Sequence, residues 1–262
     1  MNLLMTFAHH LSAFRRFVKA DIQNQFSGTY LGFTWAFIPP LVSLTIIHFV
    51  FTFGLKPSNI GDVPFSSWLT VGMVPWFFLS EGISSSSNAI LEYKFLFKKT
   101  AINMYSLPLA KLAISCVTHL FILNATLIYL LINDVHFSIT WFMLPYYIFC
   151  GISLLIGSSF FLSTLTIFIK DTPKYVSIFI QVFFWFTPIL WNSNMIPNNL
   201  KWVLLINPFY YIINGYRNSL VFNSVFEIQS IDHLIFWFLT IGLFISSLYF
   251  FKKARPIIAE MS

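Results

Sequence analysis

The side chains that could do chemistry are few, and their spacing does not form a reactive site. The two cysteines, Cys116 and Cys150, lack metal-ligand spacing, and the six histidines are scattered apart from the pair His9 and His10. G-x-S-x-G, H-E-x-x-H and G-x-x-x-x-G-K-[ST] are all absent. No D-x-D pair that could hold a metal–phosphate occurs among the acidic residues, which are Asp21, Asp62, Glu81, Glu92, Asp134, Asp171, Glu227, Asp232 and Glu260. We therefore expect no catalytic site, metal or cofactor in this chain. If ATP is used, another chain binds it together with Mg²⁺.

The composition indicates a membrane protein. Of the 262 residues, 57% are hydrophobic and only 9% are charged, whereas a soluble domain has about 25% charged residues. The mean hydropathy is +0.76. This small number of charges could not cover a water-facing surface. Most of the chain is therefore expected to lie in lipid.

Six apolar segments are candidates to cross a bilayer, whose core of about 30 Å needs about 20 helical residues. No β-alternation or internal repeat is present, so we expect an all-α polytopic membrane protein, with residues 1–262 forming one transmembrane domain. The fifth segment is short and is bounded by Pro173 and Pro188. The six segments are Trp35–Phe53, Phe65–Asn88, Leu107–Ile132, Phe142–Ile169, Lys174–Trp191 and Leu234–Phe251.

Lys and Arg predict the orientation, because they gather on the cytoplasmic side of membrane proteins. With six spans, both termini share a side. That side carries all the basic residues except Lys56, Lys201 and Arg217, and both termini are therefore expected to be cytoplasmic. This asymmetry explains the pI of about 9.3 without a nucleic-acid partner. The residues on the cytoplasmic side are Arg15, Arg16, Lys19, Lys94, Lys98, Lys99, Lys111, Lys170, Lys174, Lys252, Lys253 and Arg255.

Residues 1–30 have the pattern of an amphipathic helix rather than a secretion signal. We expect this helix to lie in the cytoplasmic headgroup layer, with its cations toward anionic lipid; the alternative is a helix packed on a soluble partner. Its polar face includes His9, Arg15, Arg16, Lys19 and Gln23. Its apolar face consists of Leu3, Phe7, Leu11, Phe14, Val18, Ile22 and Phe26.

The cytoplasmic loop 88–108 mixes aromatic residues with lysines. This pattern is typical of a docking surface with a hydrophobic centre and a charged rim. A helix resting on the membrane with snorkelling lysines fits equally well. The residues concerned are Glu92, Tyr93, Lys94, Phe95, Phe97, Lys98 and Lys99.

The segment Asn207–Phe222 is too short to cross a bilayer, and a span there would place the C-terminal cations outside. Residues 196–223 are therefore expected to form a periplasmic re-entrant hairpin of two short helices broken at Asn207–Pro208. Irregular backbone at membrane depth needs protein or a cavity around it, so the hairpin should line the outer mouth of a conduit. Arg217 could hold a backbone carbonyl or a substrate phosphate, close a gate, or snorkel to the surface. The gate or substrate-path candidates here are Asn207, Pro208, Tyr210, Tyr211, Tyr216 and Arg217.

Few ionisable residues lie inside the expected spans. Glu81 and Lys111 do, but both lie toward the cytoplasmic ends, and His48 and His119 are isolated. Ion-coupled transporters place such residues inside the bundle. A passive conduit or a transporter driven from outside the chain therefore fits better than a proton relay.

Four stretches, in order along the chain, carry a family resemblance. They are "ADIQNQFSGTYLGFTWAFIPPL", "GMVPWFFLSEGI", "IFIKDTPKYVSIFIQVFFWFTPILW" and "INPFYYIINGYRNSLVF". Together they resemble the permease subunits of ABC exporters for O-antigen or capsular polysaccharide, with teichoic-acid exporters as close relatives. The cytoplasmic turn Lys170–Asp171 departs from the family's usual Arg-Asp. Lysine keeps the positive charge of arginine but cannot form its bidentate hydrogen bonds.

The resemblance implies a homodimer in the bacterial inner membrane that works with two separate ATP-binding subunits. Loop 88–108 would be the coupling helix. The substrate would be a polysaccharide on an undecaprenyl-type lipid, passed from cytoplasm to periplasm. Aromatic side chains that could stack on its sugars are Trp35, Trp76, Phe77 and Phe78.

Two other classes stay open. A permease for a small drug or lipid would share the topology. A membrane glycosyltransferase or acyltransferase would need an acidic pair or a catalytic His in a periplasmic loop, and the isolated Asp62, Asp134 and His136 do not supply one.

Overall fold

The computed structural model describes residues 2–55, 57–93, 104–133, 135–224 and 230–260. Within these ranges the regular structure is helical, and the only β-type pairing is one antiparallel bridge between Ile60 and Val63. The α-helices are α1 (Asn2–Gln25), α2 (Ile38–Phe49), α3 (Phe65–Ser87), α4 (Ala89–Glu92), α6 (Ser106–Ile132), α7 (Leu144–Phe168), α8 (Thr172–Phe186), α9 (Trp202–Ile206), α10 (Pro208–Leu220) and α11 (Ile231–Glu260).

Short helices of other types extend these elements. The 3-10 helix Gly32–Ala36 precedes α2, and the π-helix Val50–Leu55 continues it. Another 3-10 helix, Ile139–Met143, leads into α7. Two more, Ser193–Met195 and Asn198–Leu200, lie between α8 and α9.

Prolines mark where several helices begin or end. Proline stands in the first turn of α2, α7, α8 and α10, where its missing N–H would have no helical partner anyway. Helix α8 ends at Phe186, earlier than the expected Trp191. Thr187 is extended, with ψ of 132°, because a residue before proline disfavours the helical conformation.

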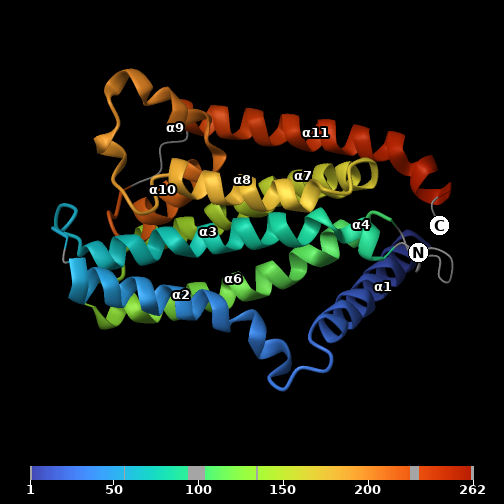
Figure 1. Cartoon of the computed structure of the whole chain (residues 1–262), viewed down its shortest axis with the longest axis horizontal. Coiled ribbons are helices and arrows are strands. Elements are labelled where there is room, and N and C mark those ends of the chain that lie inside the picture. The colour runs from blue at the N-terminus through green and yellow to red at the C-terminus, as the bar shows by residue number, and fades with distance from the viewer. Residues whose placement is uncertain (1, 56, 94–103, 134, 225–229, 261–262) are drawn as a thin grey trace.

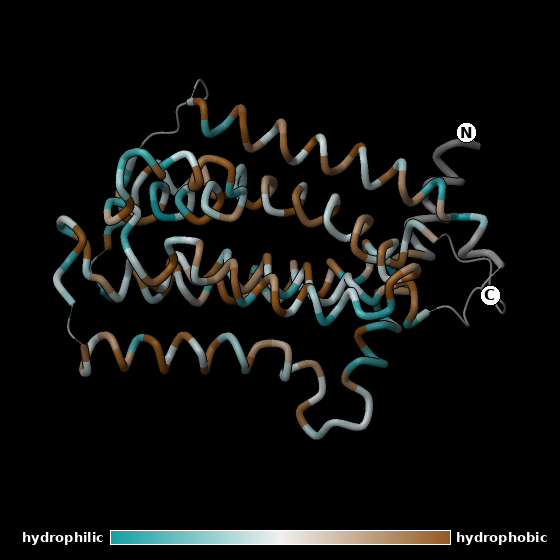
Figure 2. The backbone as a smooth tube through the Cα atoms, turned by 45° about the horizontal axis from the view of Figure 1, so that its top comes forward, coloured by the Kyte–Doolittle hydropathy of each residue, from teal (hydrophilic) through white to brown (hydrophobic). Residues whose placement is uncertain are grey.

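The long helices run side by side, and α3 lies at their centre (Figure 1). Helix α3 contacts α2, α6, α7, α8 and α10, and α11 packs along α7. The beginning of α1 and the end of α11 lie at one end of the bundle, whereas α9 and α10 lie at the other. Hydrophobic residues extend along the helices, and hydrophilic ones gather toward the two ends (Figure 2).

Among the described residues, four helical segments are long and apolar enough to cross a membrane. They are Gly32–Leu55, Ser106–Ile132, Ile139–Phe168 and Ile231–Pro256. Two of the six segments expected from the sequence are not in this set. Helix α8 has only 15 residues. Helix α3 carries many Ser and Gly residues, and most of its side chains are buried by neighbouring helices, so it has little need of a lipid-facing surface.

Candidate functional site

The break between α9 and α10 is held by the side chain of Asn207. Its Oδ1 accepts hydrogen bonds from the backbone N–H groups of Phe209 and Tyr210, at 3.0 and 3.3 Å, and so caps α10. Its Nδ2 donates to Thr187 Oγ1 at 2.9 Å. The predicted break at Asn207–Pro208 is therefore present, and it ties α10 to the chain that follows α8.

Arg217 is buried, with 2% of its surface exposed, and it binds backbone carbonyls. Its Nη1 and Nη2 donate to the carbonyls of Pro188 and Ile189, at 2.6 and 2.8 Å. Its Nε donates to the Trp68 carbonyl at 3.3 Å. Of the roles considered for Arg217, the carbonyl-binding one matches this geometry, and snorkelling to the surface does not. The guanidinium clamps α10 to α3 and to the segment after α8.

Tyr211 belongs to a polar cluster that joins α7, α10 and α11. Its hydroxyl lies 3.1 Å from the Tyr146 hydroxyl, and both lie within 3.0 Å of His233 Nδ1. Trp237 Nε1 donates to the Tyr146 hydroxyl at 2.9 Å. Sequence reasoning missed Tyr146, His233 and Trp237, because their separations along the chain give no pattern. A cavity of about 260 Å³ adjoins the cluster and is lined by Tyr147, Leu204, Leu205, Tyr210, Tyr211, Asn214, Gly215, Asn218, Ser224, Ser230 and Asp232.

Tyr216 and Phe78, both predicted from the sequence, meet at His119. The Tyr216 hydroxyl lies 2.8 Å from His119 Nε2, and the Phe78 ring stacks on the imidazole with centroids 4.3 Å apart. His119 is only 3% exposed. This arrangement fits the packing role expected of a lone histidine inside a span.

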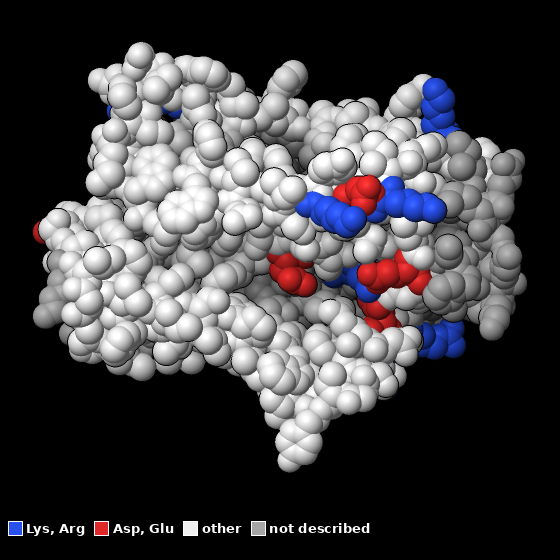
Figure 3. Space-filling model, in the orientation of Figure 1, with Lys and Arg blue, Asp and Glu red and all other residues white. Residues whose placement is uncertain are grey.

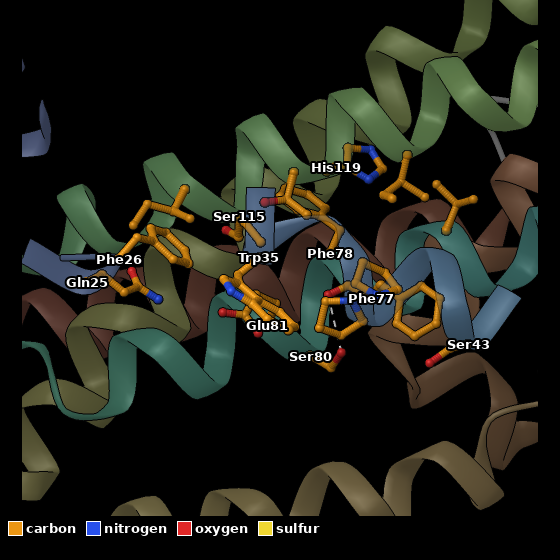
Figure 4. Close-up of a pocket in the computed structure, with 17 residues that line it drawn as sticks. Gln25, Phe26, Trp35, Ser43, Phe77, Phe78, Ser80, Glu81, Ser115 and His119 are labelled. Atoms are coloured by element: carbon orange, nitrogen blue, oxygen red, sulfur yellow. Dashed lines mark hydrogen bonds between the residues drawn. The ribbon is translucent and has the colours of Figure 1, made fainter. Parts of the chain in front are cut away.

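A cavity of about 290 Å³ opens between α2, α3 and α6 (Figure 4). Three of the four aromatic residues proposed for the substrate path, Trp35, Phe77 and Phe78, line it together with Glu81. Trp76 does not line it. Trp76 lies on another face of α3 and packs against Phe184 and Phe209, with centroids 5.3 and 5.7 Å away.

Another cavity, of about 410 Å³, adjoins the cavity lined by Trp35. Gln25, Glu81 and Ile114 line both of them. Lys111, 7% exposed, lies at the wall of the larger cavity and binds two carboxylates. Its Nζ is 3.2 Å from Asp21 Oδ1 and 2.8 Å from Glu92 Oε2.

This ion-pair network anchors the N-terminal helix to the bundle. Burial raises the pKa of Asp21, and the neighbouring ammonium of Lys111 offsets only part of that rise. Phe17 packs edge-on against Tyr93, with centroids 5.1 Å apart, and the Lys111 Nζ lies 4.9 Å from the centroid of the same Tyr93 ring. Helix α1 therefore packs on α4 and α6 of its own chain, a contact that the amphipathic pattern did not predict. Asp21 and Lys111 are 90 positions apart in the sequence, so no local pattern indicates their pairing.

The predicted docking loop 88–108 is described at its two ends, residues 88–93 and 104–108. Glu92 ends α4, Tyr93 follows it, and both contact Lys111. Lys94, Phe95, Phe97, Lys98 and Lys99 lie outside the described residues. The turn residues Lys170 and Asp171 are exposed between α7 and α8, and Asp171 pairs with Lys174 at 2.9 Å.

Comparison with known proteins identifies the family. Residues 12–221 match the family model described as ABC-2 type transporter. The chain belongs to the ABC-2 type transporter family. It is thus a multi-pass membrane protein, and the resemblance noted from its four motifs is confirmed. Among the residues that the structure describes, no three His, Cys, Asp or Glu side chains group closely enough to hold a metal ion.

The similar proteins are named as O-antigen export permeases or as a polysialic acid transport protein. The chain is 25% identical to the O-antigen export system permease protein RfbA of Klebsiella pneumoniae, over 92% of this chain and 91% of that protein. It is 23% identical to the protein of the same name from Myxococcus xanthus, over 76% of each chain. It is 22% identical to the polysialic acid transport protein KpsM of Escherichia coli, over 86% of this chain and 87% of that one.

Proposed function

We propose that this chain is the membrane subunit of an ATP-driven exporter that moves lipid-linked polysaccharide of O-antigen or capsule type from cytoplasm to periplasm. Its similarity to O-antigen export permeases over 92% of its length is the observation that carries the proposal. The cavity lined by Trp35, Phe77, Phe78 and Glu81 supports it. Sugar rings present C–H faces that stack on aromatic rings, and their hydroxyls donate hydrogen bonds to carboxylates.

The proposed topology has six spans, with α3 and α8 added to the four long apolar segments. At about 1.5 Å per residue, the 15 residues of α8 extend about 22 Å and stop short of the far side of a bilayer core of about 30 Å. The segment 187–191, which follows α8 as turns and bends, completes the crossing. Lipid offers its carbonyls no donor, and Arg217 supplies the hydrogen bonds to two of them.

Helices α9 and α10 form the re-entrant hairpin in this topology. Support comes from the packing of α10 against α3 and α7, and from the buried residues Ile212, Ile213 and Tyr216. Both chain termini are placed on the cytoplasmic side, together with most of the lysines and arginines. The hairpin is then entered and left from the periplasm, in the inner membrane of a bacterium.

The working exporter contains two copies of this chain and two ATP-binding subunits. This chain contains no phosphate-binding loop, so the partner supplies ATP hydrolysis. The loop 88–108 docks on that subunit, and ATP-driven closure moves the spans as rigid bodies. The carrier of the polymer is an undecaprenyl-type lipid.

Deletion of the gene in its own host tests the function. Surface polysaccharide should disappear, lipid-linked polymer should accumulate inside the cell, and a plasmid copy should restore export. Unchanged surface polysaccharide, with altered sensitivity to a small drug instead, would favour the small-molecule alternative.

A pair of variants tests docking on the ATP-binding subunit. Phe97→Asp places an unpaired charge at the predicted docking centre, so it should abolish export and co-purification of the ATPase while the chain still inserts. His136→Asp, at an exposed position outside the docking loop, is the control and should leave both unchanged. Normal export by Phe97→Asp would favour a loop that rests on the membrane.

A further inference from the structure

We infer that the two adjoining cavities form one acidic hollow that accepts neutral or amino-sugar polymers and disfavours polyanionic ones. The acidic hollow is defined by Trp35, Phe77, Glu81, Asp21, Glu92 and Lys111. The inference rests on the proposed function and narrows its substrate class. The names of the similar proteins give two substrates, O-antigen and polysialic acid. Polysialic acid carries a carboxylate on every sugar, so the inference disfavours it as a substrate of this chain.

The charges around the hollow are unbalanced. Three carboxylates, Asp21, Glu81 and Glu92, line it, and Lys111 is the one Lys or Arg among the described lining residues. That ammonium is already bound to Asp21 and Glu92. With the three carboxylates ionised and Lys111 charged, the net charge of the hollow is −2. In Figure 3 most of the visible charged side chains gather toward the end of the bundle that carries the chain termini.

Two carboxylates in the hollow have free capacity to accept hydrogen bonds. Asp21 is 3% exposed; its Oδ1 binds Lys111, whereas its Oδ2 has no hydrogen-bond partner among the described residues. Glu81 lines both cavities, and its side chain forms no ion pair with any described residue. A buried oxygen without a partner is costly, so a donor entering the hollow gains a hydrogen bond that the empty state lacks.

Aromatic surface lies next to these acceptors. Trp35 is 45% exposed, and it faces the same cavity as Phe77, Ser80 and Glu81 (Figure 4). A sugar ring can place its C–H face on the indole and direct hydroxyls to the carboxylate. An ammonium on an amino sugar gains from the negative charge as well. A carboxylate or phosphate on the sugar would meet like charge, and the described residues that line the hollow supply no unpaired cation to balance it.

Binding of oligosaccharides to the full chain in nanodiscs tests the inference, with tryptophan fluorescence as the readout. The probes are hexamers of a neutral hexose, of glucosamine and of sialic acid. We expect saturable changes with the first two, lost in Trp35→Phe. The sialic acid hexamer should need at least about tenfold higher concentration, and salt should reduce this difference.

The charge of Glu81 should set the preference. Glu81→Gln should weaken glucosamine binding severalfold with little effect on the neutral hexamer, and Glu81→Lys should bring the sialic acid hexamer close to the neutral one. Asp62→Lys replaces an acidic residue with lysine in the same way at an exposed turn before α3, outside the hollow, and should leave all three unchanged. Gel filtration and thermal melting check that each variant is folded.

The possible failures have different meanings. Equal binding of the sialic acid and neutral hexamers by the unmodified chain would overturn the inference and leave the proposed function standing. If the unmodified chain restores export but binds none of the hexamers, the inference is overturned and the proposed function stands. A fluorescence change that persists in Trp35→Phe would also overturn the inference alone. Loss of binding together with failure to restore export would overturn the proposed function, and the inference with it.

Discussion

The guanidinium of Arg217 lies over the indole of Trp68, 3.5 Å from its centroid, and donates to the backbone carbonyl of the same residue at 3.3 Å. One side chain of α10 thus binds both a ring and a carbonyl of α3. Its other nitrogens hold Pro188 and Ile189, where α8 has ended. Arg217 therefore replaces hydrogen bonds that a longer α8 would have made with its own backbone.

Replacing Arg217 should destabilise the protein even when the positive charge is kept. Lys has no planar fork, so Arg217→Lys can satisfy at most part of the three-carbonyl arrangement. We expect a loss of about 2 kcal/mol, and about 3 kcal/mol for Arg217→Met, which leaves the carbonyls unsatisfied. Unfolding in mild detergent by heat or denaturant measures this. Arg16→Lys, on the exposed face of α1, is the matched control and should have no measurable effect.

Gly72 gives the guanidinium its space. A Cβ at this position would overlap Arg217 Nη2 and lie 2.8 Å from its Cζ. Three hydrogen bonds hold that group, so Gly72→Ala should cost about 1–3 kcal/mol. Gly242→Ala in α11 meets nothing within 4 Å, and it should be neutral or gain up to about 1 kcal/mol from helix propensity. Because both residues act on the same contact, the losses of stability in Gly72→Ala and Arg217→Lys should not add in the double variant. Additive losses would contradict this account.

Removing Lys111 should loosen the contact of α1 with the bundle. Lys111→Ala leaves the buried carboxylate of Asp21 unpaired, at a cost of about 3 kcal/mol. Limited proteolysis between α1 and α2 should accelerate, and the melting temperature should fall. Lys174→Ala is the control, because it removes a cation from a fully exposed pair with Asp171 and should change neither measurement.

The effect of Lys111→Ala should depend on pH. Burial raises the pKa of Asp21 above its unfolded-state value, so the folded chain binds the proton more tightly. The stability contributed by that proton is fully present below the unfolded pKa and is lost as pH rises through the folded pKa. Without Lys111 the pKa should rise further. The variant should therefore lose less stability at mildly acidic pH than at mildly alkaline pH, and an equal loss at both would contradict this account.

The hairpin topology predicts which positions label from outside the cell. In a background without Cys116 and Cys150, single cysteines at the exposed positions Asn198 and Ser224 should both react with an impermeant thiol reagent. Ser224 is preferred to Asn223, whose φ of 51° a cysteine would strain. A cysteine at Lys174 should react only after permeabilisation. One at the fully buried Ile213 should not react. Labelling of Ser224 from the cytoplasm alone would refute the re-entrant hairpin.

The sequence by itself determined the class of the protein and the course of its helices. Apolar runs longer than about 18 residues can hardly be accommodated outside lipid, and prolines restrict where helices begin and end. The bounds of α3 and α6 accordingly agree with the expected spans to within one residue at each end. The break at Asn207–Pro208 was also predictable, because cap and proline signals are local. The four ordered motifs likewise indicated the family to which the chain belongs.

Only the tertiary structure decided which partners the polar side chains take. Arg217 could equally well have faced lipid headgroups, substrate or backbone, and the choice depends on α8 ending early beside α10. The pairing of Asp21 with Lys111, and the separation of Trp76 from Phe77 and Phe78, depend likewise on how distant helices pack. Local signals act within a few residues of chain, whereas burial and hydrogen bonding are satisfied between helices far apart in sequence. A single sequence contains no local trace of those contacts.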